Sequence, residues 1–344
     1  MDAATPPKKI CPYPFSRMEA WSDRFIPCCN DWLTEDFFKL PVGDDPWNGP
    51  AAQELRRRLL NDDFSLCHTD RCRVKPVSVE NLVRSFEIEA PVSPANRDAA
   101  MRGETAMPDG PTSIAVAQDP RCNLSCPSCR SQAIVKLDLR AAKAVQEAEK
   151  ILERAKPTLE VLKLAGDGEV FFSPWMRGLL KSINKVGWPR LRTIQLLTNG
   201  TLFNASSDRE LSPGTQYIRR VSVSLDAGDA ATYDLVRGGS WHRLQDNLEW
   251  MSRERQSGRF DYLQFNFTLR AENLKSARAF VELGRRLKVD NVKFTTFEYW
   301  PGSGTKWEDE AVHRKDHPRH QEFLDLRAWA QADPLVRWSV GQET

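Results

Sequence analysis

Three cysteines lie close together in the segment AVAQDPRCNLSCPSCR, at positions 122, 126 and 129. The segment follows an apolar run that is typical of a β-strand, and the loop after a strand is where βα proteins place reactive side chains. Three thiolates can bind three irons of a cubane cluster and leave the fourth iron open to another ligand. Zinc is the alternative, but a structural zinc site usually takes four protein ligands. The spacing of Cys122, Cys126 and Cys129 therefore favours a 4Fe-4S cluster.

A second group of cysteines precedes this loop, and no cysteine follows it. The group is large enough to supply four thiolates, which would close an iron–sulfur cluster or bind zinc. Its spacing does not choose between these metals, and one thiol of the adjacent pair would be left over. The group consists of Cys11, Cys28, Cys29, Cys67 and Cys72.

Composition excludes several classes of function. In 344 residues, 49 Lys and Arg nearly balance 47 Asp and Glu, so no basic field predicts nucleic acid or an anionic membrane as partner. The amino terminus MDAATPPKKI lacks the apolar run of a secretory signal, and no stretch approaches the roughly 18 apolar residues of a membrane span. We therefore expect a cytoplasmic protein, whose eight cysteines serve as metal or redox ligands rather than disulfides.

The composition of the chain changes twice after the N-terminal cysteines at 11–72. Residues 87–111 are rich in Pro, Ala and charge without a sustained apolar period, which is typical of a linker. A module at 1–86 would precede this linker. A region of alternating strands and helices at 112–300 would follow it, and a charged tail with a helix at 319–331 would occupy 301–344.

Six apolar, β-rich runs alternate with helical patterns in the region 112–300. This alternation predicts parallel βα units and an α/β fold. Ser173-Pro174 supplies an N-cap followed by proline at the first helical position. The strands are expected at 112–118, 159–165, 192–198, 220–225, 262–269 and 290–297, and further helices at 138–156, 240–257 and 272–287.

The same region resembles the radical S-adenosylmethionine superfamily. The cysteine loop is followed in order by LAGDGEVFF, LLTNG and VSVSLDAGDAATYDLVRGG. The resemblance implies a partial (β/α)6 TIM-like barrel whose 4Fe-4S cluster reduces S-adenosylmethionine to methionine and a 5′-deoxyadenosyl radical, which abstracts a substrate hydrogen. It also implies an electron donor such as flavodoxin or ferredoxin.

The resemblance assigns cofactor contacts to the ends of strands. Gly166, Gly168 and Glu169 correspond to the glycine-rich turn that meets the methionyl amino group. Glycine permits close backbone approach, and a carboxylate suits an ammonium group. Asn199 and Ser224 are the candidates for polar contacts to the ribose or the carboxylate.

Two further residues of this region, Asp226 and Arg237, are expected to order the cofactor site. One position departs from the family pattern. Ser128 stands where the family usually has an aromatic or bulky side chain near the adenine. The sequence therefore gives no account of how the adenine would be packed.

Residues 11–72 resemble the auxiliary-cluster module called SPASM, or twitch in its short form, which carries a second 4Fe-4S cluster. The module normally follows the barrel, whereas here it precedes it. A radical epimerase commonly returns a hydrogen atom from a cysteine thiol, and the only spare thiol is Cys28 or Cys29. Transfer of the substrate electron to a second cluster needs no such donor, which favours net oxidation.

The run YLQFNFTLR alternates polar and apolar residues, so its strand has two distinct faces. In a βα barrel the apolar face packs on helices, and the polar face would line the interior. A polar interior suits a hydrogen-bonding substrate. The candidate substrate contacts are Lys163, Gln264, Asn266, Arg270, Lys293 and Glu298.

We therefore predict an enzyme that oxidises, or epimerises, a small polar or carbohydrate-like molecule. Only ten residues precede Cys11, which leaves no room there for a domain that binds a peptide leader. A peptide or protein maturase of the SPASM type is the first alternative. A non-catalytic scaffold that binds zinc or an iron–sulfur cluster is the alternative from another class.

Overall fold

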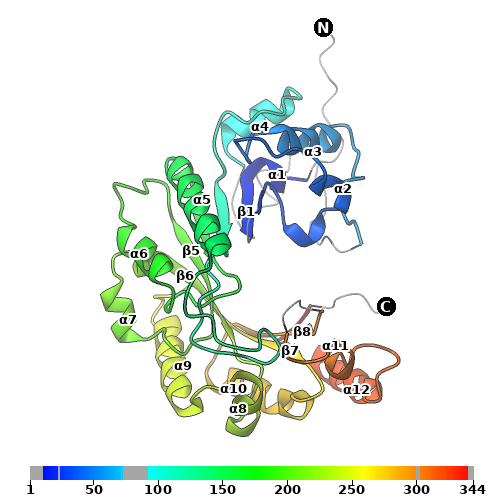
Figure 1. Ribbon diagram of the computed structural model, residues 1–344. Coiled ribbons are helices and arrows are strands. Elements are labelled where there is room, and N and C mark those ends of the chain that lie inside the picture. Colours follow the sequence, from blue (N-terminus) through cyan, green and yellow to red (C-terminus); the bar gives the residue numbers. More distant parts are fainter. Residues whose placement is uncertain (1–10, 22–23, 71, 73–91, 300–302, 340–344) are drawn as a thin grey trace. The chain divides into compact units, whose positions relative to one another are not determined.

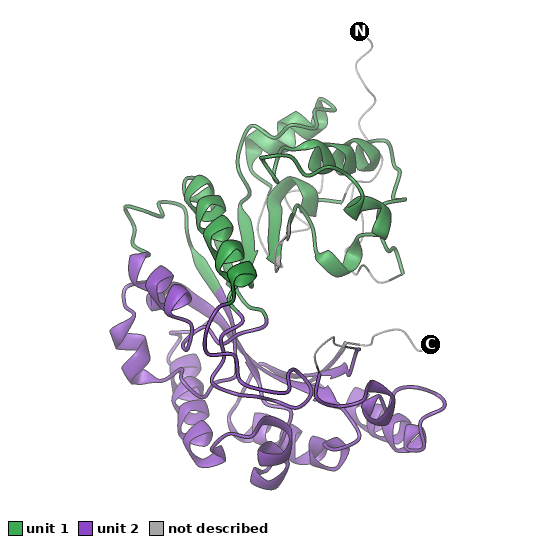
Figure 2. Cartoon of the chain, in the orientation of Figure 1, with its two compact units in different colours: residues 1–119, 138–166, 183–194 green, residues 120–137, 167–182, 195–344 purple. Residues whose placement is uncertain are grey.

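The structure is a computed structural model that describes residues 11–21, 24–70, 72, 92–299 and 303–339. The chain forms two compact units, which Figure 2 distinguishes by colour. Each unit combines separate stretches of sequence, and the division cuts across the region 112–300. Unit 1 comprises residues 1–119, 138–166 and 183–194, and unit 2 comprises residues 120–137, 167–182 and 195–344.

All six strands expected between 112 and 300 are present, close to their predicted bounds (Figure 1). Within unit 1, β3 pairs parallel with β4, and within unit 2, β7 pairs parallel with both β6 and β8. These pairs confirm the α/β fold with parallel strands. The strands are β3 (Ser113–Val116), β4 (Val161–Leu164), β5 (Thr193–Thr198), β6 (Ile218–Ser224), β7 (Tyr262–Leu269) and β8 (Asn291–Thr296).

The N-terminal cysteine region contributes its own strands to unit 1. β1 (Arg17–Trp21) pairs antiparallel with β2 (Arg24–Ile26) and parallel with β3. The region is thus joined to the βα sheet by backbone hydrogen bonds and not only through the chain at 87–111. Its other side is a small core between α3 (Pro50–Leu60) and the cysteines, in which Leu55 and Leu59 are 1% and 0% exposed.

Part of the expected linker is a helix, α4 (Pro94–Met101). Ser93 Oγ caps this helix by accepting a hydrogen bond from Asn96 N at 3.2 Å. The fully buried Asn96 side chain donates to Phe15 O and accepts from Asp109 N. The linker interpretation of 87–111 is thus corrected for the residues of α4, because the Ser-Pro start signal outweighs the lack of an apolar period. Residues 87–91 lie outside the described part.

The helices of the βα region follow their capping signals. Asp138, Ser173 and Ser240 each accept a hydrogen bond from the first turn of the helix that follows. The helix expected at 272–287 begins later, because its first residues form a turn and a short 3-10 helix. None of the helices in the described residues is long and apolar enough to cross a membrane. The helices are α5 (Leu139–Ala155), α6 (Pro174–Ser182), α7 (Ala205–Glu210), α8 (Ala230–Arg237), α9 (Trp241–Gln256) and α10 (Ala277–Arg286).

Strand β7 has the two faces that its alternating sequence predicts. Leu263, Phe265, Phe267 and Leu269 are each 0% exposed, whereas the residues between them are half-buried. The ring of Phe267 lies 4.9 Å from that of Phe280, on α10. The apolar face of β7 therefore packs on a helix, and the polar face points the other way.

The tail forms more structure than the single predicted helix. α12 (His320–Gln331) confirms that helix, and α11 (Trp307–Glu310) precedes it. Beyond α12 the chain forms β9 (Val336–Ser339), which pairs parallel with β8. The assignment of 301–344 as a helical tail is therefore wrong at its end, since the residues after α12 extend the sheet of unit 2.

A substitution at Gly228, which follows β6, tests how closely the end of this strand must approach α10. A Cβ atom at Gly228 would lie 2.1 Å from the backbone nitrogen of Phe280. We expect Gly228→Ala to lower the free energy of unfolding by about 1–3 kcal/mol, as overpacking does. In the matched control Gly178→Ala nothing lies within 4 Å of the added Cβ. Thermal unfolding followed by circular dichroism compares the two, and equal midpoints would contradict the close approach.

Candidate cofactor site

The three cysteines of the 122–129 loop lie in unit 2 on irregular backbone. Within the loop, the carbonyl of Cys126 accepts hydrogen bonds from the backbone N–H groups of Cys129 and Arg130, at 2.9 and 3.0 Å. The N–H of Cys122 donates to Ile134 O at 2.9 Å. These bonds fold the segment back on itself, so the C-x3-C-x2-C spacing becomes a compact loop.

Each of the three sulfurs receives at least one N–H donor. Hydrogen bonds and positive charges stabilise a thiolate, which is the form that binds iron. Burial raises the pKa of the Cys122 thiol, while the Leu124 N–H and the charge of Arg130 act in the opposite direction. The donors are Leu124 N and Asn199 Nδ2 to Cys122 (3.5 and 3.7 Å), Arg237 Nη1 to Cys126 (3.7 Å), and Arg130 Nε and Nη2 to Cys129 (both 3.4 Å).

This donor set fits an iron–sulfur cluster. Two guanidinium groups and an amide surround three thiols, and such groups offset the negative charge that thiolates bring to a cluster. Among the described residues, no three His, Cys, Asp or Glu side chains are gathered in the geometry of a bound metal ion. The chemistry of the surroundings therefore carries the assignment. Cys122, Cys126 and Cys129 are the residues that would hold the cluster.

The glycine-rich turn after β4 leads to a buried carboxylate. Gly166 has φ +125°, and a Cβ there would lie 2.3 Å from that of Ala117, so both its conformation and its space require glycine. Glu169 is 1% exposed and accepts hydrogen bonds from Thr198 Oγ1 and Asn199 N, both at 2.7 Å. Burial raises the pKa of Glu169, although these bonds oppose the shift. Glu169 thus ties the turn to the end of β5.

Of the residues expected at the ends of β5 and β6, Asn199 contacts the cysteine loop. Asn199 donates to Asn123 Oδ1 at 3.0 Å as well as to Cys122 Sγ. Ser224 is the half-buried last residue of β6 and lies opposite Asn266 in the sheet register. No described contact ties Gly168 to a particular side chain. Asn199 is therefore already part of the loop's support.

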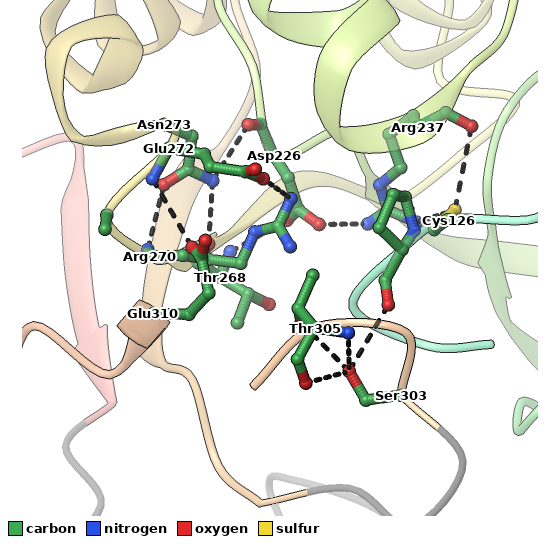
Figure 3. A network of polar contacts seen from close by, with 12 residues as sticks. Cys126, Asp226, Arg237, Thr268, Arg270, Glu272, Asn273, Ser303, Thr305 and Glu310 are labelled. Atoms are coloured by element: carbon green, nitrogen blue, oxygen red, sulfur yellow. Dashed lines mark hydrogen bonds and ion pairs between the residues drawn. The ribbon is translucent and has the colours of Figure 1, made fainter. Parts of the chain in front are cut away.

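Asp226 and Arg237 form a buried ion pair beside Cys126 (Figure 3). Arg237 Nη2 lies 2.6 Å from Asp226 Oδ2, and Asp226 Oδ1 accepts the backbone N–H of Thr268 at 2.7 Å. Burial lowers the pKa of Arg237, but Asp226 and Cys126 raise it by more, so its charge is secure. Arg237 Nε has no hydrogen-bond partner among the described residues. The pair leaves one buried donor beside the loop.

The structure brings some of the candidate substrate residues together. Gln264 Nε2 donates to Asn266 Oδ1 at 2.6 Å, and Lys293 lies opposite Asn266 in the register of β7 and β8. Glu298 is exposed and accepts a hydrogen bond from Thr296 Oγ1. Arg270 follows β7 and is fully buried. Lys163 lies on β4, in unit 1.

Sequence reasoning missed two contributions to this site. Arg130 is buried, and its guanidinium donates to Pro120 O at 2.7 Å and to Asp167 O as well as to Cys129. Its position directly after the third cysteine is the sequence signal that could have identified Arg130 as part of the site. Ser303 Oγ and Gly304 N donate to the carbonyl of Pro127 at 3.3 and 2.8 Å. No local pattern in the tail indicates that contact, which depends on the fold.

The N-terminal cysteines form two environments in unit 1. Burial raises the pKa of Cys11 to about 12, and Cys72 and Cys67 raise it too. Burial also raises the pKa of Cys28 far above its ordinary value, with Cys11 as the next cause. Cys29 differs, because after burial the charged groups that act on it are Glu19, Asp31 and Arg17. Cys11 and Cys28 are both buried in the small core against which Cys67 packs, and Cys29 Sγ lies 4.0 Å from Glu19 Oε1.

The chain has a measurable similarity to a known enzyme. It is 28% identical over 219 residues to the AdoMet-dependent heme synthase of Methanosarcina barkeri. The aligned residues cover 62% of this chain and 58% of that enzyme. The chain therefore spans somewhat more than half the length of this relative. No protein-family model matches the chain.

Solved structures give weaker similarities. Streptococcus suis SuiB bound to S-adenosylmethionine is 15% identical with a TM-score of 0.46, covering 76% of this chain and 59% of that one. The structure of anSMEcpe with bound AdoMet is 16% identical with a TM-score of 0.48, covering 67% and 64%. Similarity at this level carries no argument about function.

The three-cysteine loop and the similarity to the heme synthase both agree with the resemblance to the radical S-adenosylmethionine superfamily that the sequence carries.

The Asp226–Arg237 pair predicts a large loss of stability when one partner is neutralised. Asp226→Asn leaves a buried guanidinium without its counter-charge, which typically costs about 3–5 kcal/mol. The matched control is Asp261→Asn, whose partner Arg219 is bound at an exposed site, where loss costs about 0–1 kcal/mol. Urea unfolding of the two variants measures the difference. Similar losses in both would contradict the central role of Asp226.

Proposed function

We propose that this chain cleaves S-adenosylmethionine at a 4Fe-4S cluster held by Cys122, Cys126 and Cys129, and that it oxidises a small polar substrate. When bound, the cluster supplies the electron that yields methionine and the 5′-deoxyadenosyl radical, which removes a hydrogen atom from the substrate. One observation carries the proposal. Every sulfur of the loop faces an N–H donor, and two of these donors are guanidinium groups.

The residues of this chain would position the cofactor rather than react with it. Arg237 retains an unpartnered buried Nε, considering the described residues, and Ser224 presents a hydroxyl at the end of β6. We assign them the polar contacts to the ribose or the carboxylate of the cofactor. The turn Gly166–Glu169 and Asn199 would complete that side, with glycine allowing the cofactor to approach the backbone. The alternation of strands and helices supports a partial (β/α)6 barrel over 112–300 as the frame.

The polar face of β7 supports a hydrogen-bonding substrate. Tyr262 OH, Gln264 and Asn266 form a row joined by hydrogen bonds of 3.0 and 2.6 Å. Lys293, opposite Asn266, adds a cation to that row. Amides and hydroxyls that bond one another can exchange those bonds for substrate hydroxyls at little cost. We propose these residues as substrate contacts, with Lys163 and Glu298 as further candidates.

We also propose that the N-terminal region, residues 1–86, binds a second cluster. Cys67 lies in a β-bridge with Leu33, and Cys72 N donates to His68 O at 2.8 Å, so the chain there folds back beside Cys28. Cys11 and Cys28 are buried in one small core against which Cys67 packs, and this grouping supports Cys11, Cys28, Cys67 and Cys72 as the ligands. Four thiolates close a cubane cluster or a zinc site.

The assignment of Cys29 bears on the reaction. Its Sγ lies 4.0 Å from Glu19 Oε1, so Cys29 is the thiol left over. A second 4Fe-4S cluster, when bound, can accept the electron of a substrate radical. That route favours dehydrogenation over epimerisation. A reduced flavodoxin or ferredoxin would supply the first electron, in a cytoplasm that keeps thiols reduced.

Anaerobic reconstitution tests the catalytic cluster. We expect wild-type protein to bind about eight irons per chain, the content of two cubane clusters, and to release 5′-deoxyadenosine with a reductant. Cys126→Ala should retain about four irons and release none. Ser125→Ala, at an exposed position of the same loop, should behave as wild type. Cleavage by Cys126→Ala would refute the ligand assignment, and bound zinc without cleavage in the wild type would favour the scaffold alternative.

A pair of adjacent substitutions tests the second site. Cys28→Ala should lose about four irons, since one ligand of the N-terminal cluster is removed, and should still cleave S-adenosylmethionine. Cys29→Ala should keep both clusters. Iron analysis and electron paramagnetic resonance of the reduced proteins provide the readout. The opposite pattern, with iron lost from Cys29→Ala alone, would exchange the roles of the two cysteines.

A further inference from the structure

The buried guanidinium of Arg270 makes no hydrogen bond within the part of the chain that the structure describes. Arg270 directly follows β7, and its side chain is 1% exposed. Among the described residues, Nε, Nη1 and Nη2 all lack a hydrogen-bond partner. A guanidinium carries five N–H donors, and each buried donor left unpaired costs about 1–3 kcal/mol. The N–H donors of the Arg270 guanidinium are therefore left largely unused by the fold.

The contacts of Arg270 with its neighbours are loose. Its Nη2 lies 3.2 Å from Glu272 Oε2, but the angles do not make a hydrogen bond. Its guanidinium carbon lies 5.9 Å from the centre of the Phe297 ring. By contrast, Arg237 and Asp226 meet at 2.6 Å with a hydrogen bond. Glu272 balances the charge of Arg270 without satisfying its donors.

The backbone of Arg270, unlike its side chain, is held firmly. Arg270 N donates to Asn273 Oδ1 at 2.9 Å, and Asn273 Nδ2 donates to Thr268 O and Asp226 O at 2.9 and 3.1 Å. Figure 3 shows this network running on through Asp226 to Arg237, beside the cysteine loop. Arg270 is thus fixed at the same edge of unit 2 as the proposed cluster.

We infer that Arg270 binds a carboxylate of a small molecule held at this edge, and that Glu272 occupies the position of that carboxylate in its absence. The planar fork of arginine matches a carboxylate with two parallel hydrogen bonds. The side chain of Glu272 is 33% exposed, so it is the partner that an incoming carboxylate meets first and can displace. The inference deepens the proposed function and rests on it.

A second carboxyl group nearby is compatible with such a ligand. Glu310 is buried, and its Oε2 accepts the backbone N–H of Glu272 at 3.4 Å. Burial, followed by the charge of Glu272, raises the pKa of Glu310, while Arg270 acts in the opposite direction. Burial therefore disfavours the charged form of Glu310, which lessens its repulsion of an arriving anion.

Succinate titration of the reconstituted full-length protein tests the carboxylate site. Calorimetry at constant ionic strength should show Glu272→Gln binding succinate about tenfold more tightly than wild type, because the internal competitor is gone. Arg270→Lys, which keeps the charge but loses the fork, should bind about tenfold more weakly. Glu282→Gln, in the exposed pair with Arg285, is the matched control and should match wild type.

Glu272→Gln keeps Arg270 in place, so the test remains decisive even if Arg270→Lys does not fold. Equal succinate affinity in wild type and Glu272→Gln would overturn the inference and leave a purely structural ion pair. The carboxylate could belong to the substrate or to the methionyl end of the cofactor. Equilibrium dialysis of S-adenosylmethionine separates the two, since competition by succinate indicates the cofactor and independent binding of both indicates the substrate.

The proposed function and the carboxylate site fail in different measurements. Loss of the proposed function appears as absence of 5′-deoxyadenosine in the wild type, whatever the succinate affinity. Loss of the carboxylate site appears as unchanged succinate affinity in Glu272→Gln, whatever the cleavage activity.

Discussion

The ion pair of Asp226 and Arg237 is the interaction on which the site depends. It joins the end of β6 to the end of α8, while Asp226 also accepts the backbone N–H of Thr268 and Arg237 donates to the sulfur of Cys126. A buried ion pair is stable only when further hydrogen bonds offset the loss of hydration. The partners of this pair are the strand end on one side and the cysteine loop on the other. Its geometry therefore positions Cys126, which is one of the proposed cluster ligands.

Three arginines of unit 2 with mostly buried side chains differ in how many of their N–H donors are hydrogen-bonded. This difference distinguishes arginines that support the fold from one that could bind a ligand. Arg130 donates to two backbone carbonyls and to Cys129, so it braces the loop. Arg237 has a close carboxylate in Asp226 and a sulfur in Cys126, while its Nε has no hydrogen-bond partner among the described residues. Arg270 has a loose contact with Glu272, and its guanidinium has no hydrogen-bond partner among the described residues. A side chain whose donors are all used can only stabilise the fold, whereas one with unused donors is available to a ligand.

The sequence predicted the elements whose signals are local. The alternation in YLQFNFTLR identified both faces of β7, because neighbouring residues of a strand meet different environments. The cysteine spacing identified the loop, and Ser173-Pro174 the start of α6. What could not be predicted depends on distant parts of the chain. β9 exists because β8 offers an open edge, and the burial of Asn96 depends on Phe15 and Asp109.

The choice between Cys28 and Cys29 shows the same limit. Cys29 has an extended backbone, with φ −90° and ψ 137°, and adjacent side chains of an extended chain point in opposite directions. The two side chains therefore meet different surroundings: Cys28 is buried in the core that contains Cys11, and Cys29 Sγ lies 4.0 Å from Glu19 Oε1. The sequence predicts that the two side chains alternate, but it does not predict which of them faces the other cysteines. In the structure, Glu19 on β1 lies on the side of Cys29.

The tail belongs to the cofactor site, and this changes how the departure at Ser128 is understood. Ser303 and Gly304 donate to the carbonyl of Pro127, directly before Ser128, and a Cβ at Gly304 would lie 3.4 Å from that oxygen. The Ser303 hydroxyl and the Gly304 backbone N–H, from the segment after β8, hold the loop at the residue before Ser128. The small side chain of Ser128 is therefore accompanied by a second support, which ties the position of the cysteines to the end of the sheet rather than to the loop alone.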